Sequence, residues 1–234
     1  MYKTSIYKKA APGNFDWETF FSPETPEEIF KELDIQQMML KLREHLKENK
    51  FRLAFALNRV MTRLFEVSTP HSPRVLELGA ATGFLTRWLL RQYGGTGTLV
   101  DSSNASYQAY TRMEDDVKEN ITYLNVDLFA LELKERFDLV CSFGLIEHFK
   151  DKAPVLEVHK KMAAPTGIIV ILVPLDTPLT RVFLELHPEL NLGYRELLTE
   201  KEFKGILKQH HLQVLRTQIS KGYVYDFIGA LCRG

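Results

Sequence analysis

The chain has 234 residues, and its 30 lysine and arginine residues balance 30 aspartate and glutamate residues. That length fits one large α/β domain with an added cap, and the apolar content is ample for a core. Because no net charge attracts a polyanion, the composition disfavours nucleic acid and acidic membrane lipid as partners.

The two cysteines, Cys141 and Cys232, lie in separate apolar stretches and form no spaced pair. Neither a disulfide framework nor a zinc site is indicated, so we expect a reducing, cytoplasmic location. No stretch reaches the roughly 18 to 20 apolar residues that a transmembrane helix needs, so we expect a soluble protein without a membrane span.

The N-terminal part of the chain has the pattern of a helical leader, or lid. Thr25, Pro26 and Glu28 form a helix start, in which Thr25 caps and Glu28 completes a capping box. Apolar residues then recur at helical spacing over 35–46, and the segment 51–66 is apolar on nearly every side.

From Arg74 onward, short β-branched runs alternate with helical segments, which is typical of β-α-β units around a parallel sheet. We therefore predict an α/β domain over 71–234 behind a leader of residues 1–70. The strands are expected near 74–78, 97–101, 121–124, 137–142 and 167–173, and the helices near 83–93, 104–117, 151–162 and 199–209. Two further β-rich runs, 212–219 and 223–232, fit a closing antiparallel hairpin.

The segment 75–83 reads Val-Leu-Glu-Leu-Gly-Ala-Ala-Thr-Gly and leads into a helix. Gly79 and Gly83 supply permissive backbone dihedrals and Ala81 keeps the turn small, so backbone can approach a ligand at the end of the strand. The dinucleotide motif G-x-G-x-x-G fails, because Ala81 and Phe84 occupy its later glycine positions. No Gly-Lys-Ser/Thr of a phosphate-binding loop follows.

Two aspartates follow the next two predicted strands. The carboxylate of Asp101 can accept both hydroxyls of a ribose, and the alternative is that it caps the helix that starts after Ser102. Asp127 can accept a hydrogen bond from an adenine amino group while Leu128 presses on the ring. The alternative for Asp127 is a solvated turn.

The glycine turn matches E-x-G-x-G-x-G, the first motif of class I, Rossmann-like methyltransferases, with Ala81 in place of the middle glycine. Residues 137–149 resemble the fourth motif of small-molecule enzymes in that family, F-D-x-V-x-S-x-x-x-x-E-H, and 164–167 resembles the turn before the fifth strand. The resemblance covers residues 74–232. It implies a seven-stranded sheet that is parallel except for one reversed strand.

The same resemblance implies the cofactor S-adenosylmethionine and the residues that contact it. The glycine turn would line the methionine portion, Asp101 the ribose, and Asp127 the adenine, while Phe143 and its neighbour would offer backbone to the amino acid end. The expected cofactor-binding residues are Glu77, Gly79, Ala80, Ala81, Gly83, Asp101, Ser102, Asp127, Leu128, Ser142 and Phe143.

On the substrate side, a sulfonium methyl donor is intrinsically reactive, so the protein mainly has to align the acceptor and exclude water. His148 follows the fourth strand and is the candidate general base, with an orienting hydrogen bond in the turn as the alternative. The insertion 174–198 is expected to cover the substrate, with Arg181, His187 and Tyr194 as candidate substrate-binding residues. For His187 the alternative is an ordinary surface residue.

These features predict methyl transfer from S-adenosylmethionine to an oxygen or nitrogen atom of a small-molecule acceptor. Enzymes that methylate a flipped base usually carry an Asn/Asp-Pro-Pro-aromatic motif after the fourth strand, whereas this chain has Ser142-Phe143-Gly144-Leu145 there. No Asp-Asn pair of the catechol type is present, so no metal is expected. A protein or peptide methyltransferase, and a binding protein without turnover, are the alternatives.

Overall fold

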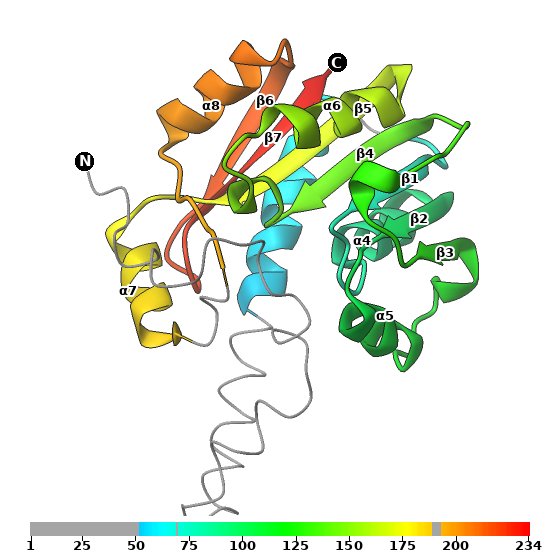
Figure 1. Ribbon diagram of the computed structural model, residues 1–234, viewed down its shortest axis with the longest axis horizontal. Helices are drawn as coiled ribbons and strands as arrows, with labels where there is room; N and C mark the ends of the chain where they lie inside the picture. The colour runs from blue at the N-terminus through cyan, green and yellow to red at the C-terminus, as the bar shows by residue number, and fades with distance from the viewer. Residues whose placement is uncertain (1–51, 69, 189–192) are drawn as a thin grey trace, which may run out of the picture.

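The computed structural model describes residues 52–68, 70–188 and 193–234. Within these residues a seven-stranded sheet has the order β3-β2-β1-β4-β5-β7-β6 (Figure 1). The strands are β1 (Arg74–Leu78), β2 (Thr96–Val100), β3 (Ile121–Leu124), β4 (Phe137–Phe143), β5 (Ala163–Pro174), β6 (Gln213–Ser220) and β7 (Phe227–Arg233). β7 runs antiparallel to both β5 and β6, and the other neighbouring pairs are parallel, so the single reversed strand is confirmed.

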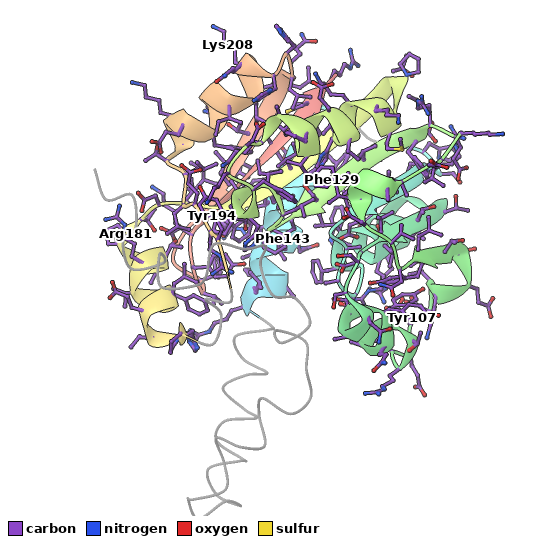
Figure 2. The ribbon with its side chains drawn as sticks, in the orientation of Figure 1. Tyr107, Phe129, Phe143, Arg181, Tyr194 and Lys208 are labelled. Carbon is purple, nitrogen blue, oxygen red and sulfur yellow. The ribbon has the colours of Figure 1, made fainter. Side chains whose placement is uncertain are left out.

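Helices flank the sheet. They are α4 (Phe84–Tyr93), α5 (Asn104–Thr111), α6 (Ala153–Met162), α7 (Pro178–Leu186), α8 (Glu200–Gln209) and a helix over 52–65, with short 3-10 turns η2 (Lys118–Asn120), η3 (Leu128–Ala130) and η4 (Ile146–His148). In Figure 2, Tyr107 on α5 and Lys208 on α8 lie at opposite ends of the molecule. The predicted α/β class is therefore confirmed for the described part of the chain.

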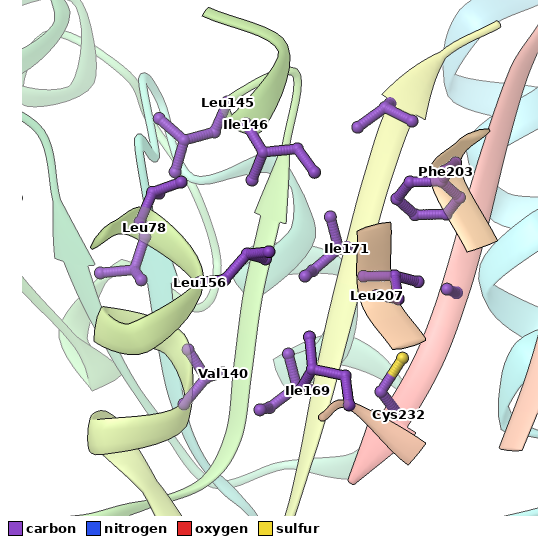
Figure 3. Packing of buried hydrophobic residues seen from close by; sticks show 14 of the residues in the cluster. Leu78, Val140, Leu145, Ile146, Leu156, Ile169, Ile171, Phe203, Leu207 and Cys232 are labelled. Carbon is purple, nitrogen blue, oxygen red and sulfur yellow. The ribbon is translucent and has the colours of Figure 1, made fainter. Parts of the chain in front are cut away.

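Two hydrophobic clusters lie on opposite faces of the sheet. Leu76 and Leu78 of β1 join a cluster with α6 and α8, which Figure 3 shows around Leu156 and Phe203. Val75, which precedes Leu76 in β1, joins a second cluster with α4 and the helix over 52–65. Because successive side chains of a strand point to opposite faces, burial on both sides explains why the central strands are mostly apolar.

The helix over 52–65 confirms the described part of the helical segment predicted over 51–66. It packs closely on the sheet, because a Cβ placed on Gly229 of β7 would lie 2.9 Å from the side chain of Leu64. The helix start at Thr25 and the helical segment 35–46 lie outside the described residues. In the part of the chain that the structure covers, no helix has both the length and the apolarity to cross a membrane.

The helix predicted over 104–117 is wrong at its C-terminal end, since α5 ends at Thr111. The carboxylate of Asp115, beyond that end, accepts hydrogen bonds from Arg87 and Arg91 of α4, at 2.7 Å each. These ion pairs hold the connection to β3 against α4. A sequence pattern does not reveal them, because their partners are more than twenty residues apart.

Candidate active site

A cavity of about 220 Å³ opens at the carboxyl ends of β1, β2 and β4. The carboxyl ends of parallel strands are where open α/β sheets bind ligands. Six of the residues predicted for the site line it: Gly79, Asp101, Ser102, Asp127, Leu128 and His148. The structure thus brings together residues that are far apart in the sequence, from Gly79 to His148.

The glycine turn after β1 is tightly packed. Gly79 and Gly83 have φ angles of +62° and +73°, a region that favours glycine. A Cβ on Gly79 would lie 2.7 Å from Leu145, and one on Gly83 would lie 2.5 Å from Leu99. Neither position tolerates a side chain without movement of these leucines, so both glycines are required by the turn itself.

Asp101 connects the first two loops of the site. Its Oδ2 accepts the N–H of Ala81 at 2.8 Å, and its Oδ1 accepts the N–H of Ser103 at 2.8 Å. The cap of α5 is Ser103, whose side chain accepts from the N–H of Ser106. The helix α5 thus has a cap of its own, and Asp101 joins the two loops while it lines the cavity.

Glu77 points away from the cavity. Its carboxylate accepts the N–H groups of Leu85 at 3.3 Å and Thr86 at 2.7 Å, in the first turn of α4. Burial raises the pKa of Glu77 to about 7, while these N–H donors oppose the rise. Since Gly83 offers no side-chain cap to α4, Glu77 accepts from backbone N–H groups that have no partner within that helix. A direct cofactor contact for Glu77 stays a prediction.

Asp127 and Leu128 form the outer wall of the cavity. The side chain of Asp127 accepts the N–H of Phe129 at 2.9 Å and so starts the turn η3. Phe129 is exposed and its ring meets that of Phe149 edge-on, with centroids 5.5 Å apart. Asp127 is exposed as well, which leaves its second carboxylate oxygen accessible.

Ser142 is buried and its hydroxyl faces α6. Nδ1 of His159 lies 2.7 Å from the carbonyl oxygen of Val155 and must therefore donate, which leaves Nε2 to accept from the hydroxyl of Ser142 at 2.9 Å. Burial lowers the pKa of His159 to about 4, so the ring is neutral. The cofactor contact predicted for Ser142 is made by its backbone. The cofactor contacts of Ser142, Phe143 and Ala80 stay predictions.

His148 lines the cavity and is almost fully buried. Its Nδ1 lies 2.8 Å from the carbonyl oxygen of Tyr194. Burial is the main cause that lowers the pKa of His148 to about 3, and the positive charge of Arg195 adds to it. The imidazole is therefore neutral over the physiological range and cannot serve as a proton donor in its charged form.

Glu147 was not singled out from the sequence, although it lies beside His148. It is 1% exposed, and its Oε2 has no hydrogen-bond partner in the described part of the chain. Its Oε1 lies 3.8 Å from Nε2 of His148. Burial raises the pKa of Glu147 to about 7, against the opposing charges of Arg195 and Lys152.

The three residues predicted for the substrate are not among those that line the cavity, although the backbone of Tyr194 contacts His148. Arg181 forms a two-point ion pair with Asp176, at 2.5 and 2.6 Å. The ring of His187 lies tilted against that of Phe183, with centroids 4.6 Å apart, and the hydroxyl of Tyr194 donates to Glu196 at 3.3 Å. Figure 2 shows Arg181 at the outer side of the molecule and Tyr194 nearer to Phe143. Their contacts with a substrate stay predictions.

Sequence reasoning missed the apolar residues of the cavity, which are Val100, Val126, Phe129, Leu145 and Phe149. Each stands within four residues of a predicted site residue, so proximity in sequence was the signal that could have found them. Within the described residues no group of three or more His, Cys, Asp or Glu side chains could hold a metal ion, and a metal-free reaction stays a prediction.

Comparison with known proteins gives the family. Residues 43–217 match a family described as a methyltransferase domain, and the chain belongs to that family. It is 30% identical over 108 residues to a malonyl-[acyl-carrier protein] O-methyltransferase of Magnetococcus marinus. The aligned stretch covers 46% of this chain and 40% of that relative. The chain is 31% identical over 98 residues to a ubiquinone biosynthesis O-methyltransferase of Rhodopseudomonas palustris, 42% of this chain and 38% of that one. The matches thus span about two fifths of these relatives.

Solved structures share the fold. The magnesium protoporphyrin IX methyltransferase of Synechocystis PCC 6803, with bound S-adenosylhomocysteine, has a TM-score of 0.60 at 17% identity, over 80% of this chain and 86% of that chain. The 1,6-didemethyltoxoflavin-N1-methyltransferase of Burkholderia thailandensis has a TM-score of 0.60 at 16% identity, over 91% and 90%. The fold is therefore the Rossmann-like fold of class I methyltransferases.

Proposed function

We propose that this protein transfers a methyl group from S-adenosylmethionine to an oxygen or nitrogen atom of a small-molecule acceptor. The observation that carries the proposal is the cavity in which Asp101, Asp127 and His148 meet around the glycine turn. Membership of the methyltransferase family supports the activity. The names of its relatives and structural neighbours, several of them with bound S-adenosylhomocysteine, support the cofactor and the acceptor class.

The cavity fits the adenosine part of the cofactor by its donor and acceptor chemistry. Each carboxylate oxygen has about two lone pairs, so Asp101 can accept ribose hydroxyls beside the two N–H groups that it already binds. The accessible oxygen of Asp127 can accept from the adenine amino group, and Leu128 and Phe129 offer apolar surface to the ring. When bound, the cofactor supplies an electrophilic methyl group on a positively charged sulfur.

The acceptor side depends on His148. Its Nδ1 donates to the carbonyl of Tyr194, so its Nε2 has the lone pair that accepts a hydrogen bond from an acceptor O–H or N–H. The low pKa makes this nitrogen a weak base, so we assign it first to orienting the acceptor. It takes the acceptor's proton only as the new bond to the methyl group forms, because that bond makes the acceptor O–H or N–H strongly acidic. Leu145 and Phe149 keep water away from the reacting atoms.

Calorimetry with S-adenosylmethionine and S-adenosylhomocysteine tests the cofactor, and we expect saturable binding of both to the full chain. Release of S-adenosylhomocysteine in the presence of pooled small metabolites tests turnover. A folded sample that gives no heat at millimolar ligand contradicts the proposed cofactor. Binding without release above the background, whatever acceptor is offered, supports a binding protein in place of an enzyme.

A protein-borne acceptor is the second candidate, because one relative is named for a substrate on an acyl-carrier protein. Separating an extract by size before the turnover assay distinguishes the two, since only small-molecule fractions should support release under the main proposal. We also propose a reducing, cytoplasmic location and an acceptor other than nucleic acid. The free, buried Cys141 and Cys232 and the balanced charge support these points.

A further inference from the structure

A second cavity, of about 150 Å³, lies between the helix over 52–65 and the turn that joins β6 to β7. Arg59 and Arg63 line it from the helix, one turn apart, and Lys221 lines it from the strand connection. All three are exposed, and no acidic side chain in the described ranges forms an ion pair with any of them. Since the fields of like charges add, this space attracts an anion.

Hydroxyl groups complete the lining. Nη1 of Arg59 donates to the hydroxyl of Tyr223, which keeps its own proton to donate. Ser220 also lines the cavity, is 6% exposed, and its hydroxyl has no hydrogen-bond partner among the described residues. Buried polar groups in folded proteins nearly always have a partner, so an orphaned hydroxyl beside three cations points to a ligand.

We propose that this second cavity binds an oxyanion group, a phosphate or a carboxylate. Arginine suits such groups because its planar guanidinium can donate two parallel hydrogen bonds to them. The volume is smaller than the roughly 300 to 1,000 Å³ of pockets that enclose a whole drug-sized ligand. The site therefore takes a compact anion or the charged end of a larger molecule.

The site lies at the same edge of the sheet as the first cavity. β6 runs parallel to β1, because β7 is antiparallel to both β5 and β6, while β5, β4 and β1 are parallel to one another. The carboxyl end of β6 is Ser220 and that of β1 is Leu78. Four strand spacings of about 4.8 Å separate the two strands, or about 19 Å. This distance lets one extended molecule reach both cavities.

Aromatic rings lie at the edge of the sheet between the two cavities, where Phe227 is fully buried and Phe143 and Tyr225 are partly exposed. Phe227 lies 5.6 Å from Phe143 and 6.2 Å from Tyr225, and Tyr225 lies 5.3 Å from Phe183, all between ring centroids. An acceptor with an apolar body and an anionic end suits this arrangement, and a free ion is the other source of the same chemistry. Only the assignment of the anion to the acceptor rests on the proposed methyl transfer.

Titration of the full chain with inorganic phosphate at constant ionic strength tests the site. We expect saturable binding that Arg63→Gln and Lys221→Gln each weaken about tenfold or more, since each removes a charged hydrogen-bond donor. Lys208→Gln is the matched control, because Lys208 is exposed on α8 at the far end of the molecule (Figure 2), and it should change nothing. Absence of saturable binding to the parent protein, or equal weakening by the control, overturns the proposal.

Two further measurements separate the outcomes. Binding of S-adenosylmethionine to the same variants should be unchanged, because the cofactor is proposed to bind in the first cavity. A parent protein that binds phosphate but not the cofactor would contradict the proposed function and would still support the anion site. Phenyl phosphate adds an aromatic ring to the probe, beside the rings of Phe55 and Tyr223, which lie 5.7 Å apart. Tighter binding than inorganic phosphate supports the end of a larger molecule, and equal binding supports a free ion.

Discussion

Nδ1 of His148 is held 2.8 Å from the backbone carbonyl oxygen of Tyr194, 46 residues further along the chain. Because a carbonyl oxygen only accepts, the proton is on Nδ1 and the lone pair on Nε2. The segment that follows α7 therefore fixes the tautomer of a residue that lines the first cavity. This contact involves the backbone of Tyr194 and not its ring.

Replacing His148 with alanine should lower turnover by about a hundredfold to ten-thousandfold, which is the usual effect of losing a positioned acid or base. Affinity for S-adenosylmethionine should change little, because Asp101 and Asp127 carry the proposed ribose and adenine contacts. Steady-state kinetics and calorimetry on the same samples measure both. His71→Ala is the control, since His71 is exposed and does not line the cavity, and it should keep turnover. A parallel loss of turnover and cofactor affinity in His148→Ala would show that His148 only braces the turn.

Asp101→Ala should weaken cofactor binding roughly tenfold to a hundredfold or more, because charge-assisted hydrogen bonds contribute about 1.5–3 kcal/mol each. Ser103→Ala is matched to it, as it removes the cap of α5 and leaves the carboxylate. That control should lower the free energy of unfolding by about 1 kcal/mol with unchanged affinity. If both variants behave alike in calorimetry, Asp101 acts through the helix and not through the ribose.

Gly79→Ala should both destabilise the protein and weaken cofactor binding. Alanine in the left-handed region costs about 1–2 kcal/mol, and its Cβ would lie 2.7 Å from Leu145, whose movement changes the cavity. Gly205→Ala is the opposite case, since no atom lies within 4 Å of that Cβ in α8, and it should stabilise by about 0.5–1 kcal/mol. Urea unfolding and calorimetry check both variants. An unchanged midpoint and affinity in Gly79→Ala would contradict the packing of the turn.

The buried, neutral His159 should contribute to the pH dependence of the free energy of unfolding. Its pKa falls from 6.5 in the unfolded chain to about 4 in the folded one, so the unfolded state takes up a proton first as the pH falls. The parent protein should therefore lose stability relative to His159→Gln between pH 6.5 and 4, by up to about 1.4 kcal/mol per unit. Comparing the two proteins cancels the opposite contributions of Glu77 and Glu147, whose pKa values are raised. A constant difference across that range would mean that His159 is charged in the folded state.

The order of the elements could be predicted because its signals are local. A buried run followed by Gly79 marks the end of β1, and polar residues such as Asp101 mark the ends of later strands. Parallel strands bring those ends to one edge, so the sequence also predicted six residues of the cavity lining. The C-terminal end of α5 and the start of β7 were predicted less well. Ion pairs of Asp115 with the distant Arg87 and Arg91 follow the first, and a turn in which Asp226 accepts the N–H of Gly222 precedes the second.

By itself, the sequence determined the family, the parallel sheet with one reversed strand, and the turn that needs Gly79 and Gly83. Only the tertiary structure decided where the polar side chains point. It directs Glu77 to the start of α4, Ser142 to His159, and Arg63 with Lys221 to one cavity. The physical reason is that backbone dihedrals and strand periodicity are set by neighbours in the chain, whereas hydrogen-bond partners and burial are set by residues that meet only after folding.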